Sequence, residues 1–446
     1  MKEKKYFCGW KKLFFRTLMN VKSLVLNQSS AAALKDILGT EPTILVVCPE
    51  PRLFSLFDSA VRCQLIQKGN PSLHYAEIFN YFASLMNDPA AEPVYRTEVE
   101  AIASYLEQGK LYNVVYSSLY DYVMARCAAL CAELVAFSVP IDAKFVDGAD
   151  LLVCHEKDHL TVVDWTETAQ RIRSRLSTTE TTVVSGGYGR TLSGYNVAIG
   201  KGGAQLVATS IAAELHAEEV TLYSDSDGIQ GIPTMTYTEA SQFCSVAGSP
   251  LDPSALWPVL KADIPLRIVS IHQPFSTGTL ISAHAQGKGS ITGVVSETNL
   301  DLITIAGTSL LGTVGVSSAL FGTLAKAGIN IRFISQSSSE YSISILVRNA
   351  DADTALAAIR TLMAENHLLT YDDVVYHEKN VSVIIVCGNR MQNVPGVSAT
   401  IYNALRDAGV SVMASAQGGE QLSISIVVSE EDTPRAIEAL KAIIGK

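Results

Sequence analysis

The chain has 446 residues, of which 48% are hydrophobic and 17% charged, and its formal net charge is -10. This composition is typical of a globular chain with about two to four domains, and it excludes a largely disordered protein. An acidic chain without a basic stripe also argues against binding to DNA or RNA, because phosphates require clustered Lys and Arg.

The first twenty residues, MKEKKYFCGWKKLFFRTLMN, interleave basic and aromatic side chains. They contain no apolar run of signal-peptide length, and no later stretch has the length and hydrophobicity of a membrane span. We therefore expect residues 1–20 to be a basic leader that packs on its own domain, with a membrane-touching amphipathic helix as the alternative. The cysteines are scattered, which favours a cytoplasmic location, and we expect no metal site.

Residues 21–285 alternate apolar strands with helical stretches, which predicts a doubly wound α/β domain. The expected strands are Thr43–Cys48, Thr181–Val184, Glu219–Tyr223 and Leu266–Ser270. The expected helices are Glu98–Gln108, Tyr120–Phe137 and Ala204–His216.

Two glycine-rich loops follow one another in this domain. The first contains Gly186 and Gly187 after an expected strand, and the second, Gly200-Lys201-Gly202-Gly203, opens an expected helix. Backbone N–H groups at a helix N-terminus, with a lysine beside them, favour a phosphate or another anion. Two tight turns that need glycine for conformational reasons would give the same pattern.

A polar segment follows the next expected strand, where ligands usually bind in open α/β sheets. Its candidate nucleotide-binding residues are Tyr223, Ser224, Asp225, Asp227 and Gly228. The two aspartates suit a metal ion or a ribose, although an Asp-rich turn explains them equally well.

An internal repeat predicts the architecture of the chain after residue 285. Residues 303–347 and 384–428 align without a gap at an offset of 81 residues. Each copy shows a strand, a glycine-containing loop, a helix, two further strands and a closing helix. This order predicts two ferredoxin-like α+β modules with their helices on one face of the sheet.

A glutamine occupies the equivalent turn of each module. A side-chain amide offers both donors and an acceptor, as an amino-acid ligand requires. A turn-stabilising role would place a polar residue there as well. The candidate effector-binding residues are Asn330, Gln336, Ser337 and Ser338 in the first module and Gln417 and Gly418 in the second.

Together these segments resemble the aspartokinase family, in which an amino-acid-kinase domain precedes tandem ACT domains. Ile334–Ser344 (ISQSSSEYSIS) and Ala416–Val428 (AQGGEQLSISIVV) are similar to the two ACT domains of threonine-sensitive aspartokinases of the aspartokinase–homoserine dehydrogenase type. Thr182–Gly189 (TVVSGGYG), Gly200–Gln205 (GKGGAQ) and Tyr223–Ile229 (YSDSDGI) resemble three kinase segments, the last of them at the ATP site. The resemblance implies a kinase-like domain over 21–285 and ACT domains over 290–370 and 371–446.

Other segments depart from the family pattern. Val25–Ser30 (VLNQSS) stands where the family has KFGGTS, so a phosphate-binding lysine and two glycines are missing. Ala204-Gln205 replaces Ser-Asp, and Val246–Pro253 (VAGSPLDP) replaces FGAKVLHP with its functional lysine. Because cations and N–H donors supply most of the catalysis in phosphoryl transfer, an active enzyme would need other cations in their place. The candidates are Lys201, which we take as the catalytic lysine, and Arg190, Lys22 and Lys35.

The resemblance implies ATP- and Mg²⁺-dependent phosphorylation of the β-carboxylate of L-aspartate, the first step towards lysine, threonine and methionine. It also implies feedback by threonine or lysine at the ACT domains, and a homodimer or larger assembly formed through them. The motif losses leave a second interpretation open, a catalytically silent pseudokinase that senses an amino acid as a regulatory subunit. Neither interpretation involves a nucleic acid or a membrane.

Overall fold

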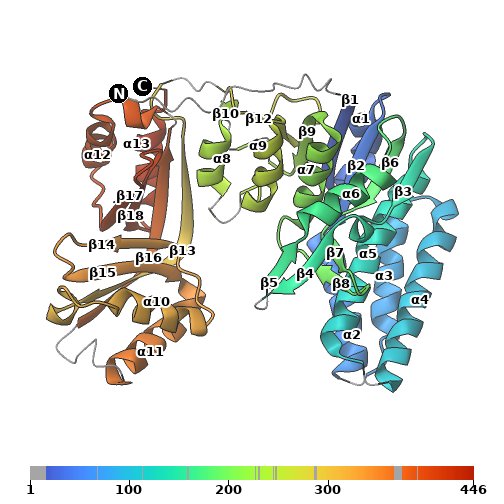
Figure 1. The fold of residues 1–446 in the computed structure, drawn as a ribbon, viewed down its shortest axis with the longest axis horizontal. Helices are drawn as coiled ribbons and strands as arrows, with labels where there is room; N and C mark the ends of the chain where they lie inside the picture. The colour runs from blue at the N-terminus through green and yellow to red at the C-terminus, as the bar shows by residue number, and fades with distance from the viewer. Residues whose placement is uncertain are drawn as a thin grey trace, which may run out of the picture. The chain divides into compact units, whose positions relative to one another are not determined.

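The computed structural model describes residues 17–445, except for 68, 113, 158–159, 227, 230–231, 245, 247–248, 286–288, 366–373 and 389. Most of the expected basic leader and Asp227 therefore lie outside the described residues. The chain divides into two compact units, and each is described by itself (Figure 1). The first comprises Met1–Tyr237 and Pro250–Ala285, and the second comprises Thr238–Ser249 and Gln286–Lys446.

An eight-stranded sheet forms the centre of the first unit, in the order β10-β12-β11-β9-β1-β2-β6-β3. The six strands from β11 to β3 are parallel to one another, whereas β12 is antiparallel to β11. Their carboxyl ends therefore meet at one edge of the sheet. The strand bounds are β1 Thr17–Leu26, β2 Thr43–Pro49, β3 Ala143–Val146, β6 Thr181–Ser185, β9 Ala217–Ser224, β10 Thr234–Met235, β11 Leu266–Ser270 and β12 Thr279–Ile281.

Helices cover this sheet, as the doubly wound pattern predicts. Each expected helix lies within or overlaps an observed one, and the four expected strands are present. The helix bounds are α1 Gln28–Leu38, α2 Pro51–Leu65, α3 Ser72–Met86, α4 Glu92–Leu111, α5 Tyr116–Ser138, α6 Trp165–Arg175, α7 Gly203–Leu215 and α9 Leu256–Ala262. A smaller sheet, in the order β5-β4-β7-β8, is formed by β4 Val153–Lys157, β5 Leu160–Val163, β7 Tyr188–Thr191 and β8 Asn196–Ala198.

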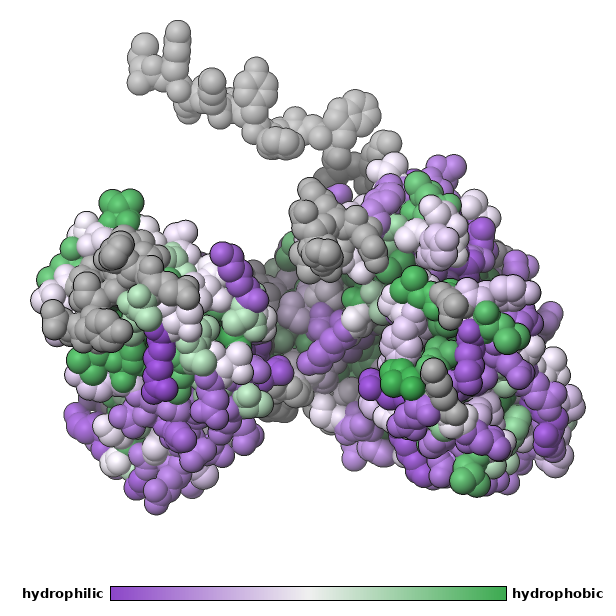
Figure 2. Space-filling model, turned by 90° about the horizontal axis from the view of Figure 1, so that it is seen from below, coloured by the Kyte–Doolittle hydropathy of each residue, from purple (hydrophilic) through white to green (hydrophobic). Residues whose placement is uncertain are grey.

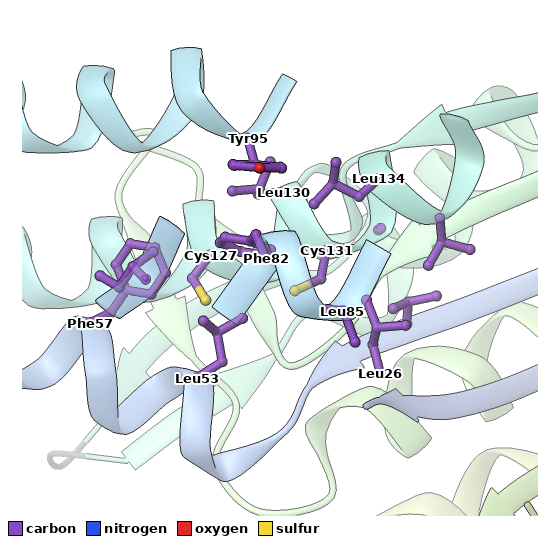
Figure 3. Packing of buried hydrophobic residues seen from close by; sticks show 14 of the residues in the cluster. Leu26, Leu53, Phe57, Phe82, Leu85, Tyr95, Cys127, Leu130, Cys131 and Leu134 are labelled. Carbon is purple, nitrogen blue, oxygen red and sulfur yellow. The ribbon is translucent and has the colours of Figure 1, made fainter. Parts of the chain in front are cut away.

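The main core of this unit lies between the sheet and helices α2 to α5. Strand β2 is buried at six of its seven positions, which explains its continuous apolar sequence. Figure 3 shows Phe82 of α3 beside Cys127 and Cys131 of α5 in this core. Both cysteines are fully buried and act here as small packing residues of the core.

One six-stranded sheet, β14-β15-β13-β16-β18-β17, joins the two modules of the second unit. The first module contains β13 Gly293–Ala306, α10 Val316–Lys326, β14 Phe333–Gln336, β15 Ser342–Arg348 and α11 Asn349–Glu365. The second contains β16 Val374–Cys387, α12 Val397–Asp407, β17 Ala414–Gln417, β18 Ser423–Ser429 and α13 Thr433–Lys441. Helix α8, Tyr237–Cys244, belongs to this unit apart from its first residue.

The first strand of each module is longer than the sequence predicts. The pattern indicates only Leu302–Ala306 and Val381–Val386, whereas β13 and β16 each have 14 residues. The first half of β13 pairs with the second half of β16, and the first half of β16 pairs with the second half of β13. Each module thereby obtains a fourth strand from the other module. The edge of each module's sheet is covered in this way, and the two sheets become one.

The repeat is also visible in the backbone. Residues 81 positions apart adopt the same left-handed conformation, although one pair changes residue type. The pairs and their φ angles are Asn299 (60°) and Asn380 (55°), Gly315 (97°) and Gly396 (90°), Gly328 (72°) and Gly409 (67°), and Glu340 (58°) and Gln421 (53°). The modules are therefore structural copies down to their turns.

Within the described part of the chain, no helix combines the length and the apolar character needed to cross a bilayer. Figure 2 shows hydrophilic side chains over much of the visible surface, with exposed hydrophobic side chains in separate small groups.

Candidate functional site

The candidate site lies where the parallel strands of the first unit end. Asn27 follows β1, Glu50 follows β2, Gly186 follows β6, and Ser224 ends β9. Because these strands are parallel, the segments after them share one edge of the sheet. The sequence-predicted loops on β6, α7 and β9 are thus placed at the edge where open α/β sheets bind ligands.

The two glycine-rich loops pack directly against each other. The N–H of Ile199 donates to the carbonyl of Gly187 at 3.1 Å, and that of Gly186 donates to the carbonyl of Val47 at 2.8 Å. A Cβ on Gly203 would lie 2.9 Å from the Cα of Gly187, so only glycine permits this approach. Gly187 itself has a φ of +97°. The structure therefore brings together two loops that the sequence only places close in the chain.

The second loop forms the uncapped N-terminus of α7. Gly200 and Gly202 have φ angles of +90° and +75°, and no side chain caps the helix. Lys201 between them is exposed. The amide of Gln205 holds the neighbouring segment, donating to the carbonyl of Pro250 at 2.8 Å and accepting from the N–H of Asp252 at 2.8 Å. The loop thus offers backbone N–H groups and one exposed cation to an anion.

The polar segment after β9 is held by its own hydroxyl groups. Ser224 Oγ donates to the carbonyl of Ser226 at 2.8 Å. The Asp225 side chain is 84% exposed, and its carboxylate lies 3.8 Å from Nε2 of His272. Asp225 is therefore accessible to a ligand, whereas the predicted site residue Asp227 lies outside the described residues.

Tyr223 and Gly228 have structural roles in the same segment. Tyr223 packs against the main core, and burial raises the pKa of its phenol to about 12. Gly228 has a φ of +72°, and a Cβ there would lie 2.3 Å from Oγ1 of Thr279. Close packing thus accounts for both residues without a ligand, although their predicted nucleotide contacts stay a prediction.

The loop between β1 and α1 is closed by a capping box. The N–H of Ser30 donates to Oδ1 of Asn27 at 2.9 Å, and the N–H of Asn27 donates to Oγ of Ser30 at 2.8 Å. Side chains therefore satisfy N–H groups at the helix N-terminus, where the family motif would present glycines to a phosphate.

A polar cavity of 670 Å³ opens beside this loop. Asn27, Gln28, Ser29, Glu50, Arg52 and Tyr81 are among the residues that line it. Glu50 accepts a hydrogen bond from the Tyr81 hydroxyl at 2.8 Å, and the Arg52 guanidinium lies 6.0 Å from the centre of the Tyr81 ring. Burial and this bond raise the pKa of Tyr81. Sequence reasoning missed these residues, although polar side chains directly after the buried strand β2 were a usable signal.

Two of the proposed substitute cations are already bound within the chain. Lys22 donates to the carbonyl of Ile37 at the end of α1, and burial lowers the pKa of its amine. The guanidinium of Arg190 pairs with Asp147 at 3.3 Å and also with Asp150. Local oxygens thus already take up donors of Lys22 and Arg190, and the expectation that either side chain reaches the phosphates stays a prediction.

The candidate effector residues lie at the ends of β14 and β17. Gln336 and Gln417 are the last residues of these strands, and both are exposed. Ser337 Oγ accepts the N–H of Ser342 at 3.0 Å and stabilises the turn of the first module. Asn330, Ser338 and Gly418 are exposed as well. The glutamines are thus available to a ligand, and their role stays a prediction.

Comparison with known proteins agrees with this architecture. Residues 96–270 match the amino acid kinase family, and residues 303–362 and 384–443 each match the ACT domain. A bifunctional aspartokinase/homoserine dehydrogenase of Daucus carota is 28% identical over 72% of this chain and 38% of its own length. The enzyme of that name from Haemophilus influenzae is 31% identical over 55% of this chain and 31% of its length. The chain thus spans about a third of these relatives.

Solved structures share the fold. Aspartokinase III of E. coli, in complex with lysine and aspartate, has a TM-score of 0.79 and 18% identity, covering 96% of this chain and 100% of that one. The aspartate kinase of Clostridium acetobutylicum has a TM-score of 0.69 and 19% identity, covering 95% and 98%. With an amino acid kinase segment, tandem ACT domains and these relatives, the chain belongs to the aspartokinase family.

Proposed function

We propose that this chain binds ATP at the edge formed by its two glycine-rich loops and transfers the γ-phosphoryl group to the β-carboxylate of L-aspartate. The packing of Gly187 against Gly203, which fixes an uncapped helix N-terminus beside Lys201, carries this proposal. Backbone N–H groups and a lysine at such a position favour the phosphates.

In the proposed reaction, a β-carboxylate oxygen of aspartate forms a bond to the γ-phosphorus. The bond from that phosphorus to the bridging oxygen of ADP breaks, and ADP leaves. Lys201 and the N–H groups of the α7 N-terminus offset the negative charge of the transferred group. Mg²⁺ usually binds through substrate phosphates and one or two carboxylates, and the exposed carboxylate of Asp225 fits that role.

The polar cavity beside the β1–α1 loop is the proposed place for the acceptor. Arg52 lines it and offers a planar pair of donors for a carboxylate, while Glu50 and Glu77 offer carboxylates for the ammonium group. The zwitterionic character of aspartate matches this mixture of charges.

The tandem ACT domains are the proposed regulatory part. We expect threonine or lysine to bind through Gln336 and Gln417, and the protein to form a homodimer through these domains. Calorimetry with a panel of amino acids tests the site. Binding by one amino acid that is lost when both glutamines are changed to Ala supports it, and no response to any amino acid contradicts it.

A second candidate function is a silent pseudokinase that acts as an amino-acid-sensing subunit. It is favoured by a specific observation, the binding of Lys22 and Arg190 to oxygens of their own chain. Among the described residues of the predicted phosphate loops, Lys201 is the only lysine.

An ADP-release assay with ATP, Mg²⁺ and aspartate, with hydroxylamine to trap acyl phosphate, separates the two functions. Turnover that is lost in Lys201→Ala but kept in Lys110→Ala supports the kinase. Lys110 is the matched control because it is exposed in the last turn of α4 and belongs to neither glycine-rich loop. Absence of turnover with intact amino-acid binding would leave only the sensor.

A further inference from the structure

A second cavity in the first unit lies between α6, α7 and α9. Its volume is 330 Å³, at the lower end of the range of small-molecule sites. Arg173, Glu214 and Lys261 line it from the last turns of the three helices. Each helix leads into a parallel strand, namely β6, β9 or β11. This end of the cavity therefore faces the start of the strands, at the edge opposite the candidate kinase site.

Two tryptophans form one wall of this cavity. Trp165 opens α6, and Trp257 lies in the first turn of α9. Their ring centroids are 5.1 Å apart with an angle of 37° between the planes. They remain 38% and 47% exposed, so a large aromatic surface faces the cavity and solvent. Such a surface favours a flat, apolar group.

A cation adjoins the aromatic wall. Nζ of Lys261 lies 4.9 Å from the centre of the Trp257 ring. Glu214, the carboxylate that lines the cavity, is bound to Arg173 at 2.5 Å. Among the described residues, Lys261 has no ion-pair partner. Lys261 lies in the last turn of α9, where the negative helix end favours a cation, and its ammonium is the group that a ligand carboxylate would meet.

Small side chains keep the space open. Ala169, Ala213 and Ala262 line the cavity from the three helices. The buried hydroxyls that also line it already have partners, since Thr168 accepts the N–H of Val153 at 3.0 Å and Ser210 donates to the carbonyl of Leu206 at 2.6 Å. Thr166 and His216 also line the cavity, and its main recognition groups are the two aromatic rings and the ammonium of Lys261.

We infer that this cavity binds an aromatic carboxylate of one or two rings, with the ring on Trp165 and Trp257 and the carboxylate on Lys261. This site is distinct from the proposed ATP and aspartate sites, and the inference does not depend on catalysis.

Tryptophan fluorescence provides the test, because the chain has only three tryptophans and two of them form the site. In a Trp10→Phe background, all tryptophan emission comes from Trp165 and Trp257. We would titrate the full chain with 3-phenylpropionate, and in parallel with 3-cyclohexylpropionate and phenethylamine. We expect saturable quenching by 3-phenylpropionate, and binding at least about tenfold weaker for the other two probes, which lack the ring or the negative charge.

Three variants localise the site. Lys261→Met should weaken binding about tenfold, and Ala213→Leu, which fills the cavity but keeps both tryptophans, should abolish it. Leu260→Ala, a half-exposed position of the same helix outside the cavity lining, should bind as the parent does. Equal binding of the three probes, or binding unchanged by Lys261→Met and Ala213→Leu, would overturn the inference. A change of sedimentation state in Lys261→Met without any probe binding would overturn it in favour of a protein interface.

Discussion

The substitution Gly186→Ala tests the contact on which the proposed nucleotide site depends. A Cβ on Gly186 would lie 2.6 Å from the Cβ and 2.9 Å from the Cα of Ala204, in the first turn of α7. It would also lie 3.0 Å from Cγ1 of Val46 in β2. Carbon atoms pack best at about 3.5–4.0 Å, so α7 and the strand must separate by about 1 Å.

Overpacking of this kind costs about 1–3 kcal/mol, which is a roughly 5- to 150-fold change in the unfolding equilibrium. Because the displaced element is the N-terminus of α7, ATP affinity should fall together with stability. Urea unfolding followed by the fluorescence of Trp165 and Trp257 measures the first effect, because both lie in the first unit. The ATP-dependent rise in melting temperature measures the second.

Gly194→Ala is the matched control in the same unit. Gly194 has a φ of +89°, and a Cβ added there would meet nothing within 4 Å, so alanine costs only backbone strain of about 1–2 kcal/mol. We expect both variants to lose stability but only Gly186→Ala to lose the response to ATP. Parental stability and an unchanged ATP response in Gly186→Ala would refute the reasoning.

Three further predictions concern single residues. Gln205→Ala should destabilise the first unit by about 1–3 kcal/mol in urea unfolding, because it leaves Pro250 and Asp252 without their hydrogen bonds. Asp164 caps α6, and hydrogen bonds from the N–H of Glu167 and from His155 lower the pKa of its carboxyl below the ordinary 3.8. Its stabilisation is therefore fully present above the ordinary pKa and is lost progressively as the pH falls through the lowered folded-state pKa, so the melting-temperature difference from Asp164→Ala should shrink as the pH falls below about 4. Burial raises the pKa of the Cys48 thiol to about 12, and mass spectrometry should find it unmodified after native iodoacetamide treatment at pH 8 but modified in urea.

Local patterns predicted most of the fold. Alternation of apolar strands and helices indicated the doubly wound domain, and the 81-residue offset indicated two copies of one module. The sequence pattern did not predict pairing between strands that lie far apart in the chain. The sequence between Gly293 and Glu297 pairs with β16, some 90 residues later, and nothing nearby reveals that partner. The membership of α8 in the second unit is likewise decided by distant contacts, among them the 2.5 Å bond between Glu239 and Thr292.

The candidate site was likewise predicted only in part: the sequence identified its loops but not the partners of its charged side chains. Glycine spacing identified both loops, since a backbone that needs left-handed conformations favours glycine. The partners of the charged side chains were harder to predict, because the sequence does not show which oxygen atoms a lysine or an arginine binds. Arg190 follows the first loop directly, yet Asp147 and Asp150, 43 and 40 positions earlier, bind it.

The hydrogen bonds at the N-termini of α1 and α7 indicate which of the two helices can offer free N–H donors to a phosphate. At α1 the side chains of Asn27 and Ser30 form a capping box that takes up two backbone N–H donors. At α7 no side chain caps the helix, although the N–H of Gly203 already donates to the carbonyl of Gly200 at 3.1 Å. This difference favours α7 over α1 as the phosphate-binding helix of the proposed function. Because Lys201 lies on a loop rather than on a strand, its position depends on the packing of Gly203 against Gly187. Any catalysis that survives in this chain must therefore be more sensitive to that contact than to the residues of β1.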